Sequence, residues 1–251
     1  MAIISRSELL RFTFNPFGVV FHRLHLWLFT PFGVDALLFT IGFFEIIFLK
    51  IYRFKQIIDM IKSTSSPRAH LPGDFAIWIF IFAELLVFGI FFVAYAFARS
   101  YNVELFNASQ STLTREFGAI NTVVLITSSY FVVQAVTAIK NDRSDVCVNW
   151  LGAALSMGAI FLVIKIIEFY GKFSVGISLS TNTFYMFYLS LTFFHFMHVI
   201  LGMVILAAIL IKARRGGYSA KDHTGVETGA SYWHMIDLVW IILFPLVYII
   251  R

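Results

Sequence analysis

The stretch DFAIWIFIFAELLVFGIFFVAYAFA (Asp74–Ala98) decides the fold of this 251-residue chain. After its first residue it holds one ionisable side chain, Glu84, and a helix of this length can cross a bilayer, which takes about 20 apolar residues. The composition of the whole chain agrees, because 59% of the residues are hydrophobic, 13% are charged and the mean hydropathy is +0.84. These values are far from those of a water-soluble domain. The sequence therefore predicts a protein of several membrane-spanning helices.

Further apolar runs of spanning length follow this stretch. A sixth candidate helix, Trp27–Tyr52, precedes it but is weakened by proline, glycine and two acidic residues, so that it could span, re-enter or lie at the interface. We predict an all-α polytopic transmembrane bundle, with an N-terminal extension (1–70) that holds the candidate helix and a linker, and a five-helix domain (71–251). Its predicted spans are about Asp74–Ala98, Ala119–Lys140, Cys147–Tyr170, Asn182–Lys212 and Ser231–Ile250.

Lysine and arginine are distributed unequally between the two sides of the predicted bundle, and cytoplasmic loops carry the excess. The count predicts a cytoplasmic segment before Asp74 and a C-terminus on the outer side of the membrane. If the candidate helix also spans, the cationic N-terminus lies outside, against the same rule. One side holds ten cations (Arg53, Lys55, Lys62, Arg68, Lys140, Arg143, Lys212, Arg214, Arg215, Lys221) and the other four (Arg99, Arg115, Lys172, Arg251).

Charge and cysteine content limit the partners. The net charge of +5 comes from cations that flank apolar helices, without the stacking platform of a nucleic-acid binder, so anionic lipid headgroups are the better partner. The single Cys147 excludes an internal disulfide and cysteine-based metal sites, which need several thiolates.

Ionisable residues deep inside the predicted spans, among them Glu84, Glu168, His195 and His198, need partners, because a charge at the bilayer centre is costly. Glu84 lies about 15 Å into its helix, so we expect it to be buried with a polar partner such as His195 or His198. It either takes part in proton transfer, anchors a lipid or helix, or forms a structural hydrogen bond. Glu168 has Lys165 three residues earlier, which favours a local ion pair.

The two histidines His195 and His198 have a spacing that puts them on one helix face, where they either ligate a metal or form hydrogen bonds. Three polar residues, Glu227, His234 and Asp237, crowd the start of the last span. They either collect protons or cap and anchor the helix among interfacial aromatic residues. We predict that the chain binds no stoichiometric haem, copper, iron or zinc, because its ligands are too few to close such a site.

Several of these segments, in this order, resemble successive helices of subunit III of the haem–copper oxidases. The resemblance covers about Leu71 to Arg251. The opening LPGD and the run LSTNTFYMFY are most similar to the NorE-type branch that is associated with nitric oxide reductases. The members of that short branch begin near LPGD, so residues 1–70 are an addition relative to them. The segments are FIFAELLVFGIFF (80–92), INTVVLITSSYFV (120–132), IKIIEFY (164–170), FFHFMHVILGM (193–203) and ETGASYWHMIDLVWIILFPLVY (227–248).

The resemblance implies a non-catalytic integral subunit of a haem–copper oxidase or nitric oxide reductase. Such a subunit of a bacterial inner membrane carries no haem or copper, packs beside the catalytic haem-bearing subunit and supports proton uptake and stability. It holds phospholipid in a cleft between its first helices and the remaining bundle. Glu84 matches the membrane-buried carboxylate of the family. The other candidates match positions for which structural or lipid-facing roles are expected: Glu168, His195, His198, Glu227, His234 and Asp237.

Three other classes are considered: a membrane oxidoreductase in its own right, an independent transporter and an assembly factor. The oxidoreductase would need haem or metal ligands on several helices, and His195, His198 and His234 are too few. An independent transporter would carry broken helices in corresponding positions of two halves, which we do not find. An assembly factor would be needed only while the catalytic site forms. Whether oxygen or nitric oxide is the terminal acceptor is not decided by the sequence.

Overall fold

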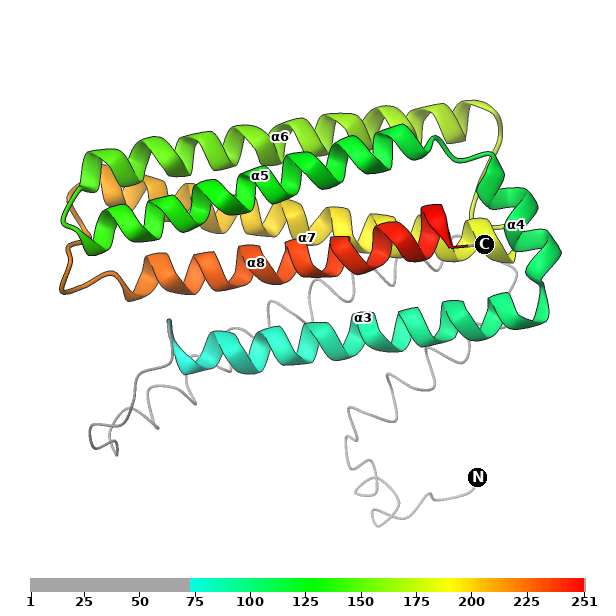
Figure 1. Cartoon of the computed structure of the whole chain (residues 1–251), viewed down its shortest axis with the longest axis horizontal. Coiled ribbons are helices and arrows are strands. Elements are labelled where there is room, and N and C mark those ends of the chain that lie inside the picture. Colours follow the sequence, from blue (N-terminus) through cyan, green and yellow to red (C-terminus); the bar gives the residue numbers. More distant parts are fainter. Residues whose placement is uncertain (1–72, 251) are drawn as a thin grey trace, which may run out of the picture.

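The structure, a computed structural model, describes residues 73–250, and these contain helices and no strand (Figure 1). The candidate helix Trp27–Tyr52 and the linker before Pro72 lie outside the described residues. Five long helices have the length and composition to cross a membrane, which confirms the predicted all-α polytopic bundle. The elements are α3 (Phe75–Tyr101), α4 (Val103–Ser111), α5 (Arg115–Lys140), α6 (Ser144–Ser174), α7 (Thr183–Arg214), α8 (Thr224–Phe244) and a π-helical turn η2 (Pro245–Ile249).

The helices α5 to α8 form the compact part of the bundle, and α3 lies at its edge against α7 and α8 (Figure 1). In the most apolar window of α3, 17% of the residues are buried inside the protein, against 56% for α8 and η2 together. One whole side of α3 is exposed, with Phe82, Leu86 and Val93 each more than 60% exposed. In a membrane this apolar side faces acyl chains or another helix.

The last long helix begins at Thr224, about two turns before the predicted Ser231. The residues of its first two turns have small or polar side chains, so a search for apolar runs does not detect this part of the helix. A Cβ atom on Gly229 would lie 2.2 Å from Cδ1 of Ile209, so the missing side chain lets α8 approach α7 closely.

Hydrogen bonds join the start of α3 to the start of α8. Gly73 has φ of +83°, a left-handed conformation that favours glycine, and its backbone N–H donates to Oε2 of Glu227 at 3.1 Å. The N–H of Asp74 donates to Oγ1 of Thr228 at 3.1 Å, and the Asp74 side chain accepts from the N–H of Ala76. These bonds satisfy backbone donors that a helix start leaves free.

The opposite end of the bundle is closed by the short helix α4, which the apolar pattern did not predict. Its polar sequence forms a helix because of tertiary contacts: Phe106 is fully buried, and Nε2 of Gln110 donates to the carbonyl of Val247 at 2.9 Å. That carbonyl lies in η2, where Pro245 breaks the regular hydrogen-bond pattern of α8. Arg99 of α3 donates to the carbonyl of Ile250 and so holds the same end.

Candidate functional site

Glu84 of α3 is buried, with 4% of its surface exposed, and among the described residues its hydrogen-bond partner is His198 on another helix. Its Oε2 lies 3.0 Å from Nε2 of His198 on α7. The sequence predicted a partner among the two histidines of that helix, and the structure places His198 there. The rings of Phe88 and Phe194 pack on the imidazole, with centroids 5.3 and 4.6 Å away.

The other nitrogen of His198 determines the proton count of this pair. Nδ1 lies 2.8 Å from the carbonyl oxygen of Phe194, and a carbonyl can only accept, so Nδ1 carries a hydrogen. A hydrogen bond between Nε2 and the Glu84 carboxyl group then requires one more proton, on either partner. The pair is therefore neutral overall and holds one proton that can lie on the imidazole or on the carboxyl group.

His195 is fully buried and has different surroundings from His198. Its Nε2 donates to the carbonyl oxygen of Ile236 on α8 at 3.2 Å, and its ring packs against Phe161 and Trp240. The two histidines thus hydrogen-bond to different helices and do not point at a common ligand. Among residues 73–250 no group of three or more His, Cys, Asp or Glu side chains could hold a metal ion.

Lys165 and Glu168 form the predicted local ion pair in α6, with Nζ and Oε2 2.9 Å apart. Lys165 is fully buried and also donates to the hydroxyl of Tyr248 at 2.9 Å. The Tyr188 and Tyr248 hydroxyls each donate to Oε1 of Glu168 at 2.7 Å. The ammonium group lies 5.2 Å from the ring centroids of Phe169 and Trp240. We call the four hydrogen-bonded residues the lysine network; it joins α6, α7 and η2.

Glu227 has other polar partners than the residues with which the sequence grouped it. Its Oε1 pairs with Nζ of Lys140 at 2.7 Å and lies 3.5 Å from Nε2 of His223, while its Oε2 caps α3 through Gly73. Because α8 begins at Thr224, Glu227 lies in the first turn. The predicted crowding of three polar residues at one helix start is therefore wrong, since Asp237 lies roughly 15 Å further along the axis.

His234 and Asp237 lie inside the membrane-spanning part of α8. Nδ1 of His234 is hydrogen-bonded to Oγ of Ser129 on α5. Asp237 is 6% exposed, and the side chain of Ser129 on α5 is a hydrogen-bond neighbour of its carboxyl group.

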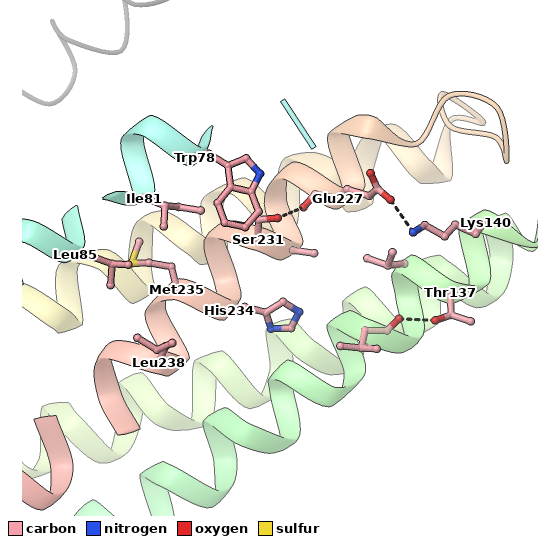
Figure 2. A pocket seen from close by; sticks show the side chains of 13 residues that line it. Trp78, Ile81, Leu85, Thr137, Lys140, Glu227, Ser231, His234, Met235 and Leu238 are labelled. Atoms are coloured by element: carbon pink, nitrogen blue, oxygen red, sulfur yellow. Dashed lines mark hydrogen bonds and ion pairs between the residues drawn. The ribbon is translucent and has the colours of Figure 1, made fainter. Parts of the chain in front are cut away.

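A cavity of about 550 Å³ lies between α3, α5 and α8 near the Lys140–Glu227 pair (Figure 2). Figure 2 shows Trp78, Ile81 and Leu85 on the α3 side and His234 pointing into the space between α8 and α5. The sequence did not predict this cavity or the tyrosines of the lysine network. The sequence feature that could have indicated Tyr248 is Pro245, three residues earlier. A proline near a helix end can change the helix geometry, and Tyr248 lies in the π-helical turn that follows.

The chain is similar to known proteins over most of its length. The sequence profile of the family Cytochrome c oxidase subunit III matches residues 12–251, and so begins within the segment that we treated as an N-terminal extension. Cytochrome c oxidase subunit 3 of Thermostichus vulcanus is 34% identical over 186 residues, which are 72% of this chain and 90% of that protein.

Two further relatives carry related names. Cytochrome c oxidase subunit 3 of Synechocystis sp. is 34% identical over 177 residues, which are 70% of this chain and 75% of that protein. Cytochrome bo(3) ubiquinol oxidase subunit 3 of Buchnera aphidicola is 25% identical over 193 residues, which are 77% of this chain and 94% of that protein.

Proposed function

The chain belongs to the cytochrome c oxidase subunit III family, and we propose that it is a non-catalytic integral membrane subunit of a haem–copper respiratory oxidase. The observation that carries the proposal is the family match over residues 12–251. The relatives named above are subunits of cytochrome c and ubiquinol oxidases. The partner is accordingly a catalytic haem-bearing subunit in a bacterial cell membrane, and haem and copper belong to that partner.

The buried polar groups support a role in proton handling and stability. The neutral pair of Glu84 and His198 holds one proton in the middle of the bundle. The lysine network, in contrast, gives each of its charged groups at least two polar partners and ties three elements together. We propose that the first pair takes part in proton uptake by the complex and that the second stabilises the subunit.

The test is purification of the complex through an affinity tag on this chain in mild detergent. We expect a haem-bearing partner to co-purify, with a Soret band that disappears when the partner gene is deleted, because the haem belongs to the partner. A Soret band intrinsic to this chain would contradict the proposal. An unaccompanied chain that moves a solute in vesicles would favour the transporter alternative.

Oxygen is the acceptor that we propose, because the named relatives belong to oxidases. The NorE-type branch, suggested by LPGD (71–74) and by the run from Leu179 to Tyr188, is the second candidate. The purified complex distinguishes them: oxygen consumption with a quinol or cytochrome c supports the oxidase, and nitric oxide consumption without oxygen turnover supports the other branch.

We also propose that the C-terminus is periplasmic. The ends of the helices at the loops 141–143 and 215–223 carry Lys140, Arg143, Arg214 and Arg215, whereas the opposite end carries Arg99, Arg115 and Lys172. A C-terminal alkaline phosphatase fusion should be active and a C-terminal green fluorescent protein fusion dark. The reverse pattern would overturn the orientation.

A further inference from the structure

A series of hydrogen-bonding side chains leads from the cavity between α3, α5 and α8 to the buried carboxyl group of Asp237. His234 and Asp237 are three residues apart and so lie on one face of α8. Both have the same neighbour on α5. Oγ of Ser129 is hydrogen-bonded to Nδ1 of His234, and the Ser129 side chain is a hydrogen-bond neighbour of the Asp237 carboxyl group. One serine hydroxyl therefore joins an imidazole to a carboxyl group that is 6% exposed.

The hydrogens of these three side chains can be arranged in two ways. The Ser129 hydroxyl has one hydrogen, so it donates to one neighbour and accepts from the other. In the first arrangement Ser129 donates to Nδ1 of His234 and accepts from a protonated Asp237, while His234 carries its hydrogen on Nε2. In the second, Nδ1–H of His234 donates to Ser129, and the serine hydroxyl donates to the Asp237 carboxylate. The second arrangement holds one proton fewer, and Nε2 of His234 is the atom at which that proton enters or leaves.

Nε2 of His234 has access to the cavity. Figure 2 shows the His234 ring pointing into the space between α8 and α5, and the residue lines the cavity. Of its two ring nitrogens, only Nδ1 is hydrogen-bonded to a side chain or backbone group within residues 73–250. Nε2 is therefore free to exchange a proton with water.

Polar side chains line the cavity from its mouth to His234 (Figure 2). Lys140 and Glu227 lie at the mouth, and Thr137 and Ser231 lie about one helical turn further in. From Glu227 to His234 the helix rises roughly 10 Å. The cavity has a volume of about 550 Å³, and a water molecule occupies about 30 Å³ of the liquid, so water has room to reach His234 beside these polar groups.

The other ionisable groups around these side chains already have partners. Besides His234, the ionisable residues that line the cavity are Lys140 and Glu227, whose side chains form an ion pair at 2.7 Å. The α3 residues of the cavity are not ionisable. The two histidines of α7, which also packs against α8, are hydrogen-bonded to the carbonyl of Ile236 and to Glu84. A proton that enters at His234 therefore has a direct route to Ser129 and the carboxyl group behind it.

We propose that His234, Ser129 and Asp237 form a proton relay that loads and unloads the Asp237 carboxyl group from the cavity. In loading, a hydronium ion gives a proton to Nε2 of His234, the Nδ1 proton passes to Oγ of Ser129, and the serine's own hydrogen passes to Asp237. One bond to hydrogen breaks for each that forms, and unloading reverses the steps. The relay deepens the proposed role in proton uptake and rests on it for the membrane setting. It adds a second proton-holding group to the pair of Glu84 and His198.

The first measurement follows the proton of Asp237. The full-length chain, purified in mild detergent with whatever accompanies it, is transferred from H₂O to D₂O and examined by infrared spectroscopy. The difference between wild type and Asp237→Asn isolates the carbonyl band of the protonated carboxyl group, and the shift of this band with time gives the exchange rate. The absence of such a band at every pH at which the chain stays folded would overturn the proposal.

The second measurement breaks the relay. Ser129→Ala removes the joining hydroxyl, and His234→Gln keeps a polar neighbour for Ser129 but cannot pass a proton between two ring nitrogens. Both should slow exchange at Asp237 on the order of a hundredfold, because a positioned proton donor or acceptor contributes about 10²–10⁴-fold. Ser129→Thr keeps the hydroxyl and should exchange at nearly the wild-type rate. The matched control is Ser128→Ala, whose lost hydroxyl bonds to the carbonyl of Ala154 on α6.

Equal exchange rates in wild type and Ser129→Ala would overturn the relay, and so would equal slowing in Ser129→Ala and Ser128→Ala. If Ser129→Ala does not fold, His234→Gln decides alone, and a wild-type rate in it overturns the proposal. Exchange is measured on this chain itself. A chain that shows the relay but never co-purifies with a haem-bearing subunit would therefore contradict the proposed function and support the relay.

Discussion

Glu84 and Glu168 are both buried carboxylates, but the bundle holds them in opposite ways. Glu168 accepts from Lys165, Tyr188 and Tyr248 in the compact part of the bundle. Glu84 comes from the peripheral helix α3 and has one described partner, His198. Because several donors fix the charge of Glu168, it suits a structural role. The pair of Glu84 and His198 shares one proton in a single hydrogen bond, which suits a role in proton transfer.

The largest effect is expected in the lysine network. Lys165→Met removes the counter-ion of Glu168 and leaves a buried charge uncompensated, which costs about 3–5 kcal/mol of stability. Thermal unfolding of the purified subunit, or the yield of assembled complex, measures the loss. The double variant Lys165→Met with Glu168→Met removes both charges and should recover part of the stability. If Lys165→Met is as stable as the double variant, the uncompensated charge of Glu168 is not the cause of the loss of stability.

A smaller effect on stability is expected at the other carboxylate. Glu84→Ala leaves Nε2 of His198 without its partner, which costs about 1–3 kcal/mol for a buried polar group. Glu84→Gln keeps a hydrogen bond with His198 but has no acidic proton, so we expect nearly wild-type stability together with slower proton uptake and less sustained turnover of the complex. If Glu84→Gln equals wild type in turnover as well as in stability, the pair is only structural.

Glycine substitutions compare the same two regions without touching a charge. A Cβ atom on Gly202 of α7 would lie 2.6 Å from Ile236 and 2.9 Å from the Trp233 ring, whereas a Cβ atom on Gly89 of α3 has open space around it. Gly202→Ala should therefore cost about 1–3 kcal/mol by overpacking. Gly89→Ala should change stability by less than about 0.5 kcal/mol. Thermal unfolding of both variants checks this, and equal losses would contradict the description of α3 as loosely packed.

The smallest effect concerns a single hydrogen bond between α5 and α8. Nε1 of Trp240 donates to Oγ1 of Thr122 at 2.9 Å. Thr122→Val removes the acceptor and should cost about 0.5–1.5 kcal/mol. Thr127→Val is the matched control, because within residues 73–250 that hydroxyl bonds to the carbonyl of Val123 in its own helix and to no other helix. A loss of stability in the control as large as in Thr122→Val would assign the effect to helix propensity instead of the bond between helices.

The sequence predicted the spans and the local pair of Lys165 and Glu168, because apolar runs and a spacing of three residues are properties of one helix. It narrowed the partner of Glu84 to two histidines through their depth in the membrane. It did not predict α4, which is polar and depends on contacts with η2. Nor did it predict the tyrosines around Glu168, since Tyr188 and Tyr248 reach the carboxylate from α7 and η2.

The cavity between α3, α5 and α8 was beyond sequence analysis for the same reason. Its lining comes from α3, α5 and α8, and only the packed bundle shows that α3 and α5 leave a space over α8. Glu227 was grouped with His234 and Asp237 by proximity in the sequence. The structure shows its true partners to be Lys140 and the start of α3.

The central claim is that this chain supports a catalytic subunit without carrying its redox centre. The most direct measurement compares the catalytic partner purified with and without this chain, by its haem spectrum, its initial rate and the decay of activity over many turnovers. The account predicts the same spectrum and nearly the same initial rate, with faster loss of activity when the chain is absent. Identical decay and identical stability would contradict an accessory role, and a haem spectrum that lacks its catalytic-site features would instead indicate an assembly factor.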